Sequence, residues 1–268
     1  MIKIGVTTTD SIKILFFAAK LVELDKRIRV GAVSYLNTKP LLYGIKRSGL
    51  MDRIDLIEDY PSRIATMLVE DKIDVGLVPV AIIPKLNEYH IITDFCIGAE
   101  GNVASVCLFS EVPMEQIEKV LLDYQSRTSV NLAKVLLKHY WKKELILEDA
   151  KEDFREFIGG TVAGVVIGDR ALIQRKTSKY VYDLGAEWIA MTGLPFVFAA
   201  WVANKKLDEG FITEFGQANA YGLKHIDEVI AENNFEPYDL NEYYKKNISY
   251  DLTEEKRKGL KLFLSYLK

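Results

Sequence analysis

Short apolar runs and helix-spaced apolar residues alternate along the first third of the chain. Residues 28–33 and 74–80 are apolar runs typical of strands covered on both faces of a parallel sheet, and 54–57 is a further predicted strand. After Pro40 and after Pro61, apolar residues recur at helical spacing, and proline suits the first turn of a helix. The pattern predicts strand–helix–strand–helix–strand, the order of a parallel sheet with right-handed crossovers.

A second group of such units follows in the middle of the chain. Strands are predicted at 103–109, 120–123, 163–167, 181–184 and 196–202. From residue 207 onward the pattern is helical, and Thr253 is a good N-cap for the last helix. Two groups of strand–loop–helix units predict an α/β fold with two lobes.

Composition removes several classes of function from consideration. The net charge of −3 is spread evenly along the 268 residues, so we expect neither a nucleic-acid groove nor a polybasic membrane patch. The three histidines lie far apart without metal-ligand spacing, so no metal site is expected. No apolar run approaches the ~20 residues that span a bilayer. The two cysteines, Cys96 and Cys107, lie in apolar surroundings, which favours a reducing compartment, the cytoplasm.

Polar loops follow several of the predicted strands. In 34–38 and 126–129, hydroxyls and an amide come directly before a helix, where free backbone N–H groups favour anions. Open α/β sheets bind ligands at the carboxyl ends of their strands. Each of these residues has a simpler interpretation as well. Asn37, the 126–129 hydroxyls and Asp169 could cap helices, and Gly193 and Pro195 could be turn residues.

The amino-acid sequences of these segments are distinctive when they are taken together. The segments 34–41, 74–80, 105–106, 126–129 and 192–196, in this order, resemble the chorismate dehydratases of the futalosine route to menaquinone, the MqnA family. The resemblance runs from about residue 27 to the carboxyl end. Residues 1–26 fall outside it and are interpreted as an extension, since Asp10, Lys13 and the charges at 23–27 do not suit a signal peptide.

The resemblance implies a two-lobed, type II periplasmic-binding-protein-like fold with a ligand cleft between the lobes. In that arrangement lobe one comprises 27–107 plus 202–268, and lobe two comprises 108–201. The chain would cross between the lobes near 107–109 and 199–202. Polar loops of both lobes would then meet one small molecule.

The activity implied by the resemblance is the dehydration of chorismate to 3-[(1-carboxyvinyl)oxy]benzoate, a lyase reaction without a cofactor. Asn37 and Ser105 are implied as the catalytic residues. The implied substrate-binding residues are Ser34, Tyr35, Leu36, Ser126, Arg127, Thr128, Ser129, Gly168, Asp169, Gly193, Pro195 and Phe196. Among these loops only Asp169 is acidic and none contains histidine, so we expect the second carboxylate of chorismate to serve as the base, with Asp169 as the rival.

Two other functions stay open at this point. One is the related 1,4-dihydroxy-6-naphthoate synthase of the same pathway, although that relative carries a different opening motif from residues 34–37 here. The other is a non-catalytic solute-binding protein for a small carboxylate. A shared fold cannot decide among the three, because function depends on the site.

Overall fold

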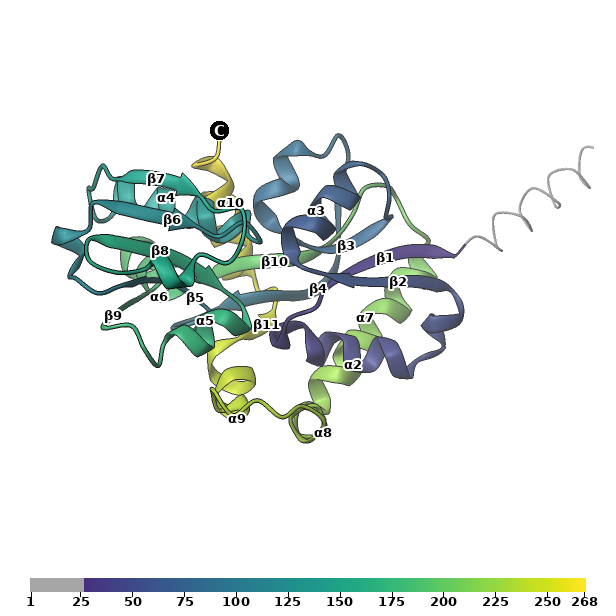
Figure 1. Cartoon of the computed structure of the whole chain (residues 1–268). Helices are drawn as coiled ribbons and strands as arrows, with labels where there is room; N and C mark the ends of the chain where they lie inside the picture. The colour runs from purple at the N-terminus through teal and green to yellow at the C-terminus, as the bar shows by residue number, and fades with distance from the viewer. Residues whose placement is uncertain (1–26) are drawn as a thin grey trace, which may run out of the picture.

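Two β-sheets organise the computed structural model, which describes residues 27–268 (Figure 1). The larger sheet has six strands, in spatial order β11 (Ser249–Asp251), β4 (His90–Ala99), β10 (Phe196–Ala203), β3 (Val75–Pro79), β1 (Ile28–Val33) and β2 (Ile54–Asp59). The smaller has five, in spatial order β7 (Ile146–Asp149), β6 (Lys119–Leu122), β8 (Val162–Ile167), β5 (Val106–Ser110) and β9 (Tyr180–Asp183). The expected extension, residues 1–26, lies outside the described residues.

In the larger sheet, β1 pairs in parallel with β2 and β3, as the apolar runs predict. The long strand β10 then enters antiparallel between β3 and β4, and every one of its residues is buried. Helix α2 (Lys39–Arg47) follows β1, and α3 (Pro61–Val69) follows β2. Helix α7 (Glu209–Lys224) packs closely against α2. Glycine at position 44 permits this approach, since a Cβ there would lie 1.8 Å from the Ala218 carbonyl oxygen.

In the smaller sheet, β6 pairs in parallel with β7 and β8, and β5 runs antiparallel to β8 and β9. Its helices are α4 (Thr128–His139), α5 (Asp169–Gln174) and α6 (Leu184–Thr192). The remaining helices are α8 (Ile226–Glu232), α9 (Leu240–Glu242), the π-helix η6 (Tyr243–Asn247), α10 (Glu254–Ser265) and the 3-10 turns η1 (Leu36–Thr38), η2 (Gly49–Asp52), η3 (Val80–Lys85), η4 (Met114–Gln116) and η5 (Arg155–Phe157). The Thr253 side chain caps α10, as predicted. Within residues 27–268, no helix is long and apolar enough to cross a membrane.

The chain passes between the sheets at 100–105 and returns at 193–195, which differs from the expected crossings. Residues 107–109 lie inside β5 of the smaller sheet, and residues 199–202 lie inside β10 of the larger one. The predicted boundaries at 107/108 and 201/202 therefore come several residues too late. Continuous apolar runs cover both strands, and such runs do not tell which sheet a strand joins. We call 27–99 with 196–268 the larger unit, and 106–192 the smaller unit.

Candidate active site between the two units

A cavity of about 50 Å³ lies where the two units meet. Its polar lining consists of Tyr35 and Asn37 from the larger unit and of Ser126, Thr128 and Ser129 from the smaller unit. Apolar residues complete the wall, among them Phe198 and Ala199 of β10. Small-molecule sites usually measure about 300–1,000 Å³. The two units are therefore closed on each other in this structure.

Three more open grooves, of about 400 to 550 Å³, lie elsewhere on the described part of the chain. One lies between α2 and α7, one beside the β6–β7 edge, and one along α4. Each is lined by residues of a single unit. The cavity at the junction differs from them because polar side chains of both units converge on it.

The loop after β1 places Asn37 at the cavity wall. Leu36–Thr38 forms a 3-10 turn, and Pro40 stands in the first turn of α2. The Thr38 hydroxyl donates to Asn37 Oδ1 at 3.1 Å, and the Tyr250 hydroxyl donates to the Asn37 carbonyl oxygen at 3.0 Å. No side chain caps α2, so the simpler interpretation of Asn37 as a helix cap does not describe this loop.

The 126–129 loop places the start of α4 at the same cavity. Ser126 Oγ accepts from the Ser129 N–H at 3.0 Å and so satisfies one N–H group of the first turn. Thr128 Oγ1 accepts from the Ala81 N–H of the larger unit at 3.1 Å, which ties the two units together. Arg127 is exposed and lies outside the cavity lining. The positive end of the α4 dipole favours an anion in the cavity.

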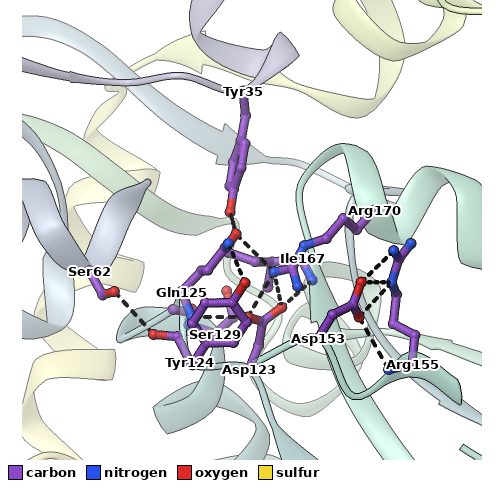
Figure 2. A network of polar contacts seen from close by, with 11 residues as sticks. Tyr35, Ser62, Asp123, Tyr124, Gln125, Ser129, Asp153, Arg155, Ile167 and Arg170 are labelled. Atoms are coloured by element: carbon purple, nitrogen blue, oxygen red, sulfur yellow. Dashed lines mark hydrogen bonds and ion pairs between the residues drawn. The ribbon is translucent and has the colours of Figure 1, made fainter. Parts of the chain in front are cut away.

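A polar network holds Tyr35 against the smaller unit (Figure 2). The Tyr35 hydroxyl donates to Gln125 Oε1, which also accepts from Arg170 Nη2 at 2.9 Å. The same Arg170 nitrogen lies 2.8 Å from both carboxylate oxygens of Asp123. Burial raises the pKa of Asp123 although Arg170 opposes the shift, and burial also raises the pKa of Tyr35. Tyr35 therefore remains a hydrogen-bond donor at neutral pH.

Gly168 and Asp169 form a further connection between the units. The Leu36 N–H donates to Asp169 Oδ1 at 3.1 Å, and burial raises the pKa of this carboxyl group. Gly168 lines the cavity with φ at +64°, and a Cβ there would lie 2.7 Å from the Tyr35 ring. Asp169 and Leu36 do not line the cavity. Ser34, which begins the loop, is exposed and does not line it either.

Ser105 lies directly behind the cavity wall. Its side chain is fully buried, and Val106, the next residue, lines the cavity. The Tyr243 hydroxyl donates to Ser105 Oγ at 2.8 Å. Ala104, which precedes Ser105, has a φ of +61°, and the Asp183 carboxylate holds its N–H at 2.8 Å. A non-glycine residue in this region costs about 1–2 kcal/mol, and such strain gathers at functional sites.

The predicted binding residues Gly193, Pro195 and Phe196 lie outside the cavity. Gly193 ends α6 in the left-handed conformation, with φ at +71°. A Cβ at Gly259 of α10 would lie 2.1 Å from the Pro195 carbonyl oxygen, so the two backbones are in close contact. The Phe196 ring is fully buried, 5.0 Å from the ring of Phe263. This segment supports α10, and β10 first reaches the cavity at Phe198.

Sequence reasoning also missed residues that the structure brings to the site. Gln125 and Arg170 stand directly beside the predicted segments 126–129 and 168–169, and that adjacency is the only signal in the sequence. Phe198 lies inside a predicted strand, where nothing marks one face as the cavity side. Tyr243 belongs to a region predicted simply as helical.

No group of three or more His, Cys, Asp or Glu side chains within residues 27–268 could hold a metal ion.

A family model described as menaquinone biosynthesis matches residues 28–268, nearly the whole chain. The chain belongs to this family. Two chorismate dehydratases are similar to it over 89% of its length. The one from Thermus thermophilus is 26% identical, with 94% of that protein covered, and the one from Campylobacter jejuni is 28% identical, with 96% covered.

Solved structures show the fold of this menaquinone-biosynthesis chain. A protein from Archaeoglobus fulgidus is similar with a TM-score of 0.67 at 15% identity, over 90% of this chain and 96% of that one. A Candida albicans gene product with the generic periplasmic binding protein fold has a TM-score of 0.58 at 12% identity, over 89% and 90%. The predicted periplasmic-binding-protein-like fold class is confirmed.

Proposed function

We propose that this protein is a chorismate dehydratase that forms 3-[(1-carboxyvinyl)oxy]benzoate in the futalosine route to menaquinone. The observation that carries the proposal is the lining of the junction cavity, where Asn37 and the start of α4 offer donors and no carboxylate or imidazole side chain is present. Family membership and two similar chorismate dehydratases support it. We place the enzyme in the cytoplasm, since both cysteines are free and buried, as suits a reducing compartment.

The ring carboxylate of chorismate belongs at the start of α4 in this proposal. Thr128 and Ser129 lie there, and the helix dipole stabilises negative charge. The proton to be lost is on the ring carbon that bears the enolpyruvyl ether. This carbon is connected through a ring double bond to the carbon that carries the carboxylate. Negative charge that develops on proton loss spreads into the carboxylate, where fixed donors stabilise it. Departure of the neighbouring hydroxyl, as water, then leaves an aromatic ring.

The base in this proposal is the second carboxylate of chorismate, on the enolpyruvyl arm. Asp169, the rival, already accepts the Leu36 N–H and stands outside the cavity lining. A carboxylate is a weak base, but enforced proximity offsets that weakness by about 7–11 kcal/mol in favourable geometry. Asn37 orients the arm or the departing hydroxyl from the cavity wall. Ser105 does not line the closed cavity but precedes Val106, which does, and in this proposal it donates to the same groups when the ligand is bound.

Substrate entry requires the two units to separate. Several hydrogen bonds join them beside the cavity, among them those of Tyr35 with Gln125, Leu36 with Asp169, Ala81 with Thr128 and Ser62 with Tyr124. The crossing segments 100–105 and 193–195 act as hinges in this proposal. Small-angle scattering should show a larger radius of gyration for the free protein than with a benzoate product analogue. Identical compact profiles would contradict this opening.

Incubation of the purified protein with chorismate, with the product followed by chromatography, tests the function. We expect stoichiometric formation of the aromatic enol ether, and a modest loss of rate in Asp169→Asn. Near-complete loss of turnover in Asp169→Asn with unchanged substrate binding would make Asp169 the base. Binding of chorismate without any conversion would overturn the dehydratase and favour a solute-binding protein.

A further inference from the structure

The carboxyl-terminal part of the chain supplies a hydroxyl to each of the two proposed catalytic residues. Tyr243 donates to Ser105 Oγ across 138 positions of sequence, and Tyr250 donates to the Asn37 carbonyl oxygen across 213 positions. Both tyrosines are buried, with 0% and 7% exposure. Contacts this remote in sequence hold loops of different elements in one geometry.

Tyr243 is the first residue of the π-helix η6. Such helices are rare, and they occur frequently at functional sites. The adjacent Tyr244 is equally buried, at 1% exposure, and its ring lies 5.5 Å from that of Tyr243. Its hydroxyl has no hydrogen-bond partner among residues 27–268. The two neighbouring tyrosines are therefore both buried, but only Tyr243 uses its hydroxyl, in the bond to Ser105 and in contact with the Asn37 side chain.

Ser105 depends on Tyr243 for its orientation. The Ser105 hydroxyl donates to the Val103 carbonyl oxygen at 3.5 Å, which is long for a hydroxyl hydrogen bond and holds the hydroxyl weakly. Because Tyr243 donates to Ser105 Oγ at 2.8 Å, the hydrogen of Ser105 must point away from Tyr243. That hydrogen is then left for a group other than Tyr243 to accept.

We propose that Tyr243 is a positioning residue that acts through Ser105, turning the Ser105 hydroxyl into a fixed donor for the reacting ligand. The inference rests on the proposed function, because it needs a substrate group that Ser105 can reach. Tyr243 does not line the cavity, so it acts on the ligand indirectly.

The surroundings of Tyr243 keep it in the donor form. Burial raises its pKa well above 10, and the charge of Asp169 and the neighbouring Tyr244 raise the pKa further. Hydrogen bonding with Ser105 and with the Asn37 side chain opposes this shift but does not reverse it. The hydroxyl is therefore protonated throughout the neutral range, which suits orientation and excludes a role as base.

Tyr243→Phe and Tyr244→Phe form a matched pair, since each removes one buried hydroxyl from the same turn. With chorismate as substrate, Tyr243→Phe should lower kcat roughly 10- to 100-fold with KM changed by about twofold or less, because a small misplacement of a reacting group is costly. Tyr244→Phe should keep kcat within about twofold of the wild type. Thermal unfolding of both variants should be similar.

A double-mutant cycle with Ser105→Ala separates action through Ser105 from a general effect on folding. If Tyr243 acts through Ser105, adding Tyr243→Phe to Ser105→Ala should change kcat by less than about twofold. Additive losses, or equal kcat in Tyr243→Phe and Tyr244→Phe, would overturn the inference. Full kcat in Ser105→Ala alone would overturn it even without a folded Tyr243→Phe protein. A wild-type protein that does not convert chorismate would instead refute the proposed function.

Discussion

Two segments with equally distinctive sequences, 34–38 and 192–196, have different places in the molecule. The first leaves a strand and opens a helix, and its Tyr35 and Asn37 line the cavity. The second follows α6 and begins β10. The ring centroid of its Phe196 lies 5.2 Å from that of Trp188 and 5.0 Å from that of Phe263. A distinctive sequence therefore marks a constraint without telling whether a ligand or the packing of a helix imposes it.

The direction of the chain explains the difference. After β1, the chain presents the beginning of a helix, where N–H groups can meet a ligand. At 192–193 the chain ends a helix, where carbonyl groups lie and Gly193 supplies the left-handed turn. Substitutions in the first segment should therefore act on turnover, and those in the second on stability.

The largest expected effect is that of Phe196→Ala in the second segment. Truncation of this fully buried ring should lower the free energy of unfolding by about 3–5 kcal/mol, because it leaves a cavity among aromatic rings. The protein that remains folded should keep kcat within a few-fold of the wild type. Denaturant unfolding and turnover at low temperature measure the two quantities. Lost turnover at normal stability would place this segment at the ligand after all.

Asn37→Ala should show the reverse behaviour in the first segment. We expect turnover to fall by about 10²–10³, the usual cost of one donor that stabilises a transition state. The unfolding temperature should change little, because the Asn37 side chain is partly exposed. Asn131→Ala, which removes an amide from the surface of α4, is the control and should retain full activity. A large loss of stability without loss of kcat would contradict a role at the ligand.

Gly168→Ala and Gly193→Ala sharpen the comparison, since both glycines have positive φ, +64° and +71°. A Cβ at Gly168 would meet the Tyr35 ring at 2.7 Å, whereas no atom lies within 4 Å of a Cβ at Gly193. Gly193→Ala should cost about 1–2 kcal/mol of backbone strain and leave kcat unchanged. Gly168→Ala should cost more and also lower kcat. Equal effects on kcat would show that the Tyr35 contact is unimportant.

The smallest effect concerns pH. Because burial raises the pKa of Asp169, the folded protein holds its proton where the unfolded chain has lost it. The contribution of Asp169 to the free energy of unfolding therefore falls as pH rises from 3.8 through the raised pKa. Asp169→Asn should remove this slope in unfolding titrations.

Asp153 offers a control of opposite sign. Arg155 lowers the pKa of Asp153 to about 2, so the stabilising contribution of Asp153 is present above pH 3.8 and is lost as pH falls from 3.8 through about 2. Asp153→Asn should therefore remove a slope of the other sign. The same pH dependence in Asp169→Asn and the wild type would mean that burial does not raise the pKa of Asp169 in the folded protein.

Most of the strands could be predicted because their residues are apolar on both faces. The strand β7 was missed since all four of its residues are exposed, and β11 has only three residues. The residues at 114–117 form only a short 3-10 turn, Met114–Gln116, because the chain already enters β6 at Lys119. The pattern of apolar residues predicts the extent of a strand but not the sheet that it joins. The predicted positions at which the chain crosses between the two sheets are therefore wrong.

The site was harder to predict than the fold. The sequence marks loops that start helices, and it predicts Tyr35, Asn37 and the hydroxyls of residues 126, 128 and 129, which the structure places at the cavity. Ser34 and Arg127, predicted from the same two loops, are exposed and do not line it. Hydrogen bonds between residues far apart in the sequence leave no local pattern from which they could be predicted. The hydrogen bonds from Tyr35 to Gln125 and from Tyr243 to Ser105 join residues 90 and 138 positions apart.

These long separations have a consequence for biosynthesis. A ribosome delivers Asn37 and Ser105 early, while Tyr250 and Tyr243 follow 213 and 138 residues later. Until those late residues emerge, the early ones lack the hydroxyls that hold them. A nascent or carboxyl-terminally shortened chain would thus carry every proposed catalytic side chain without its supporting hydroxyl, so that full turnover begins when translation is nearly finished.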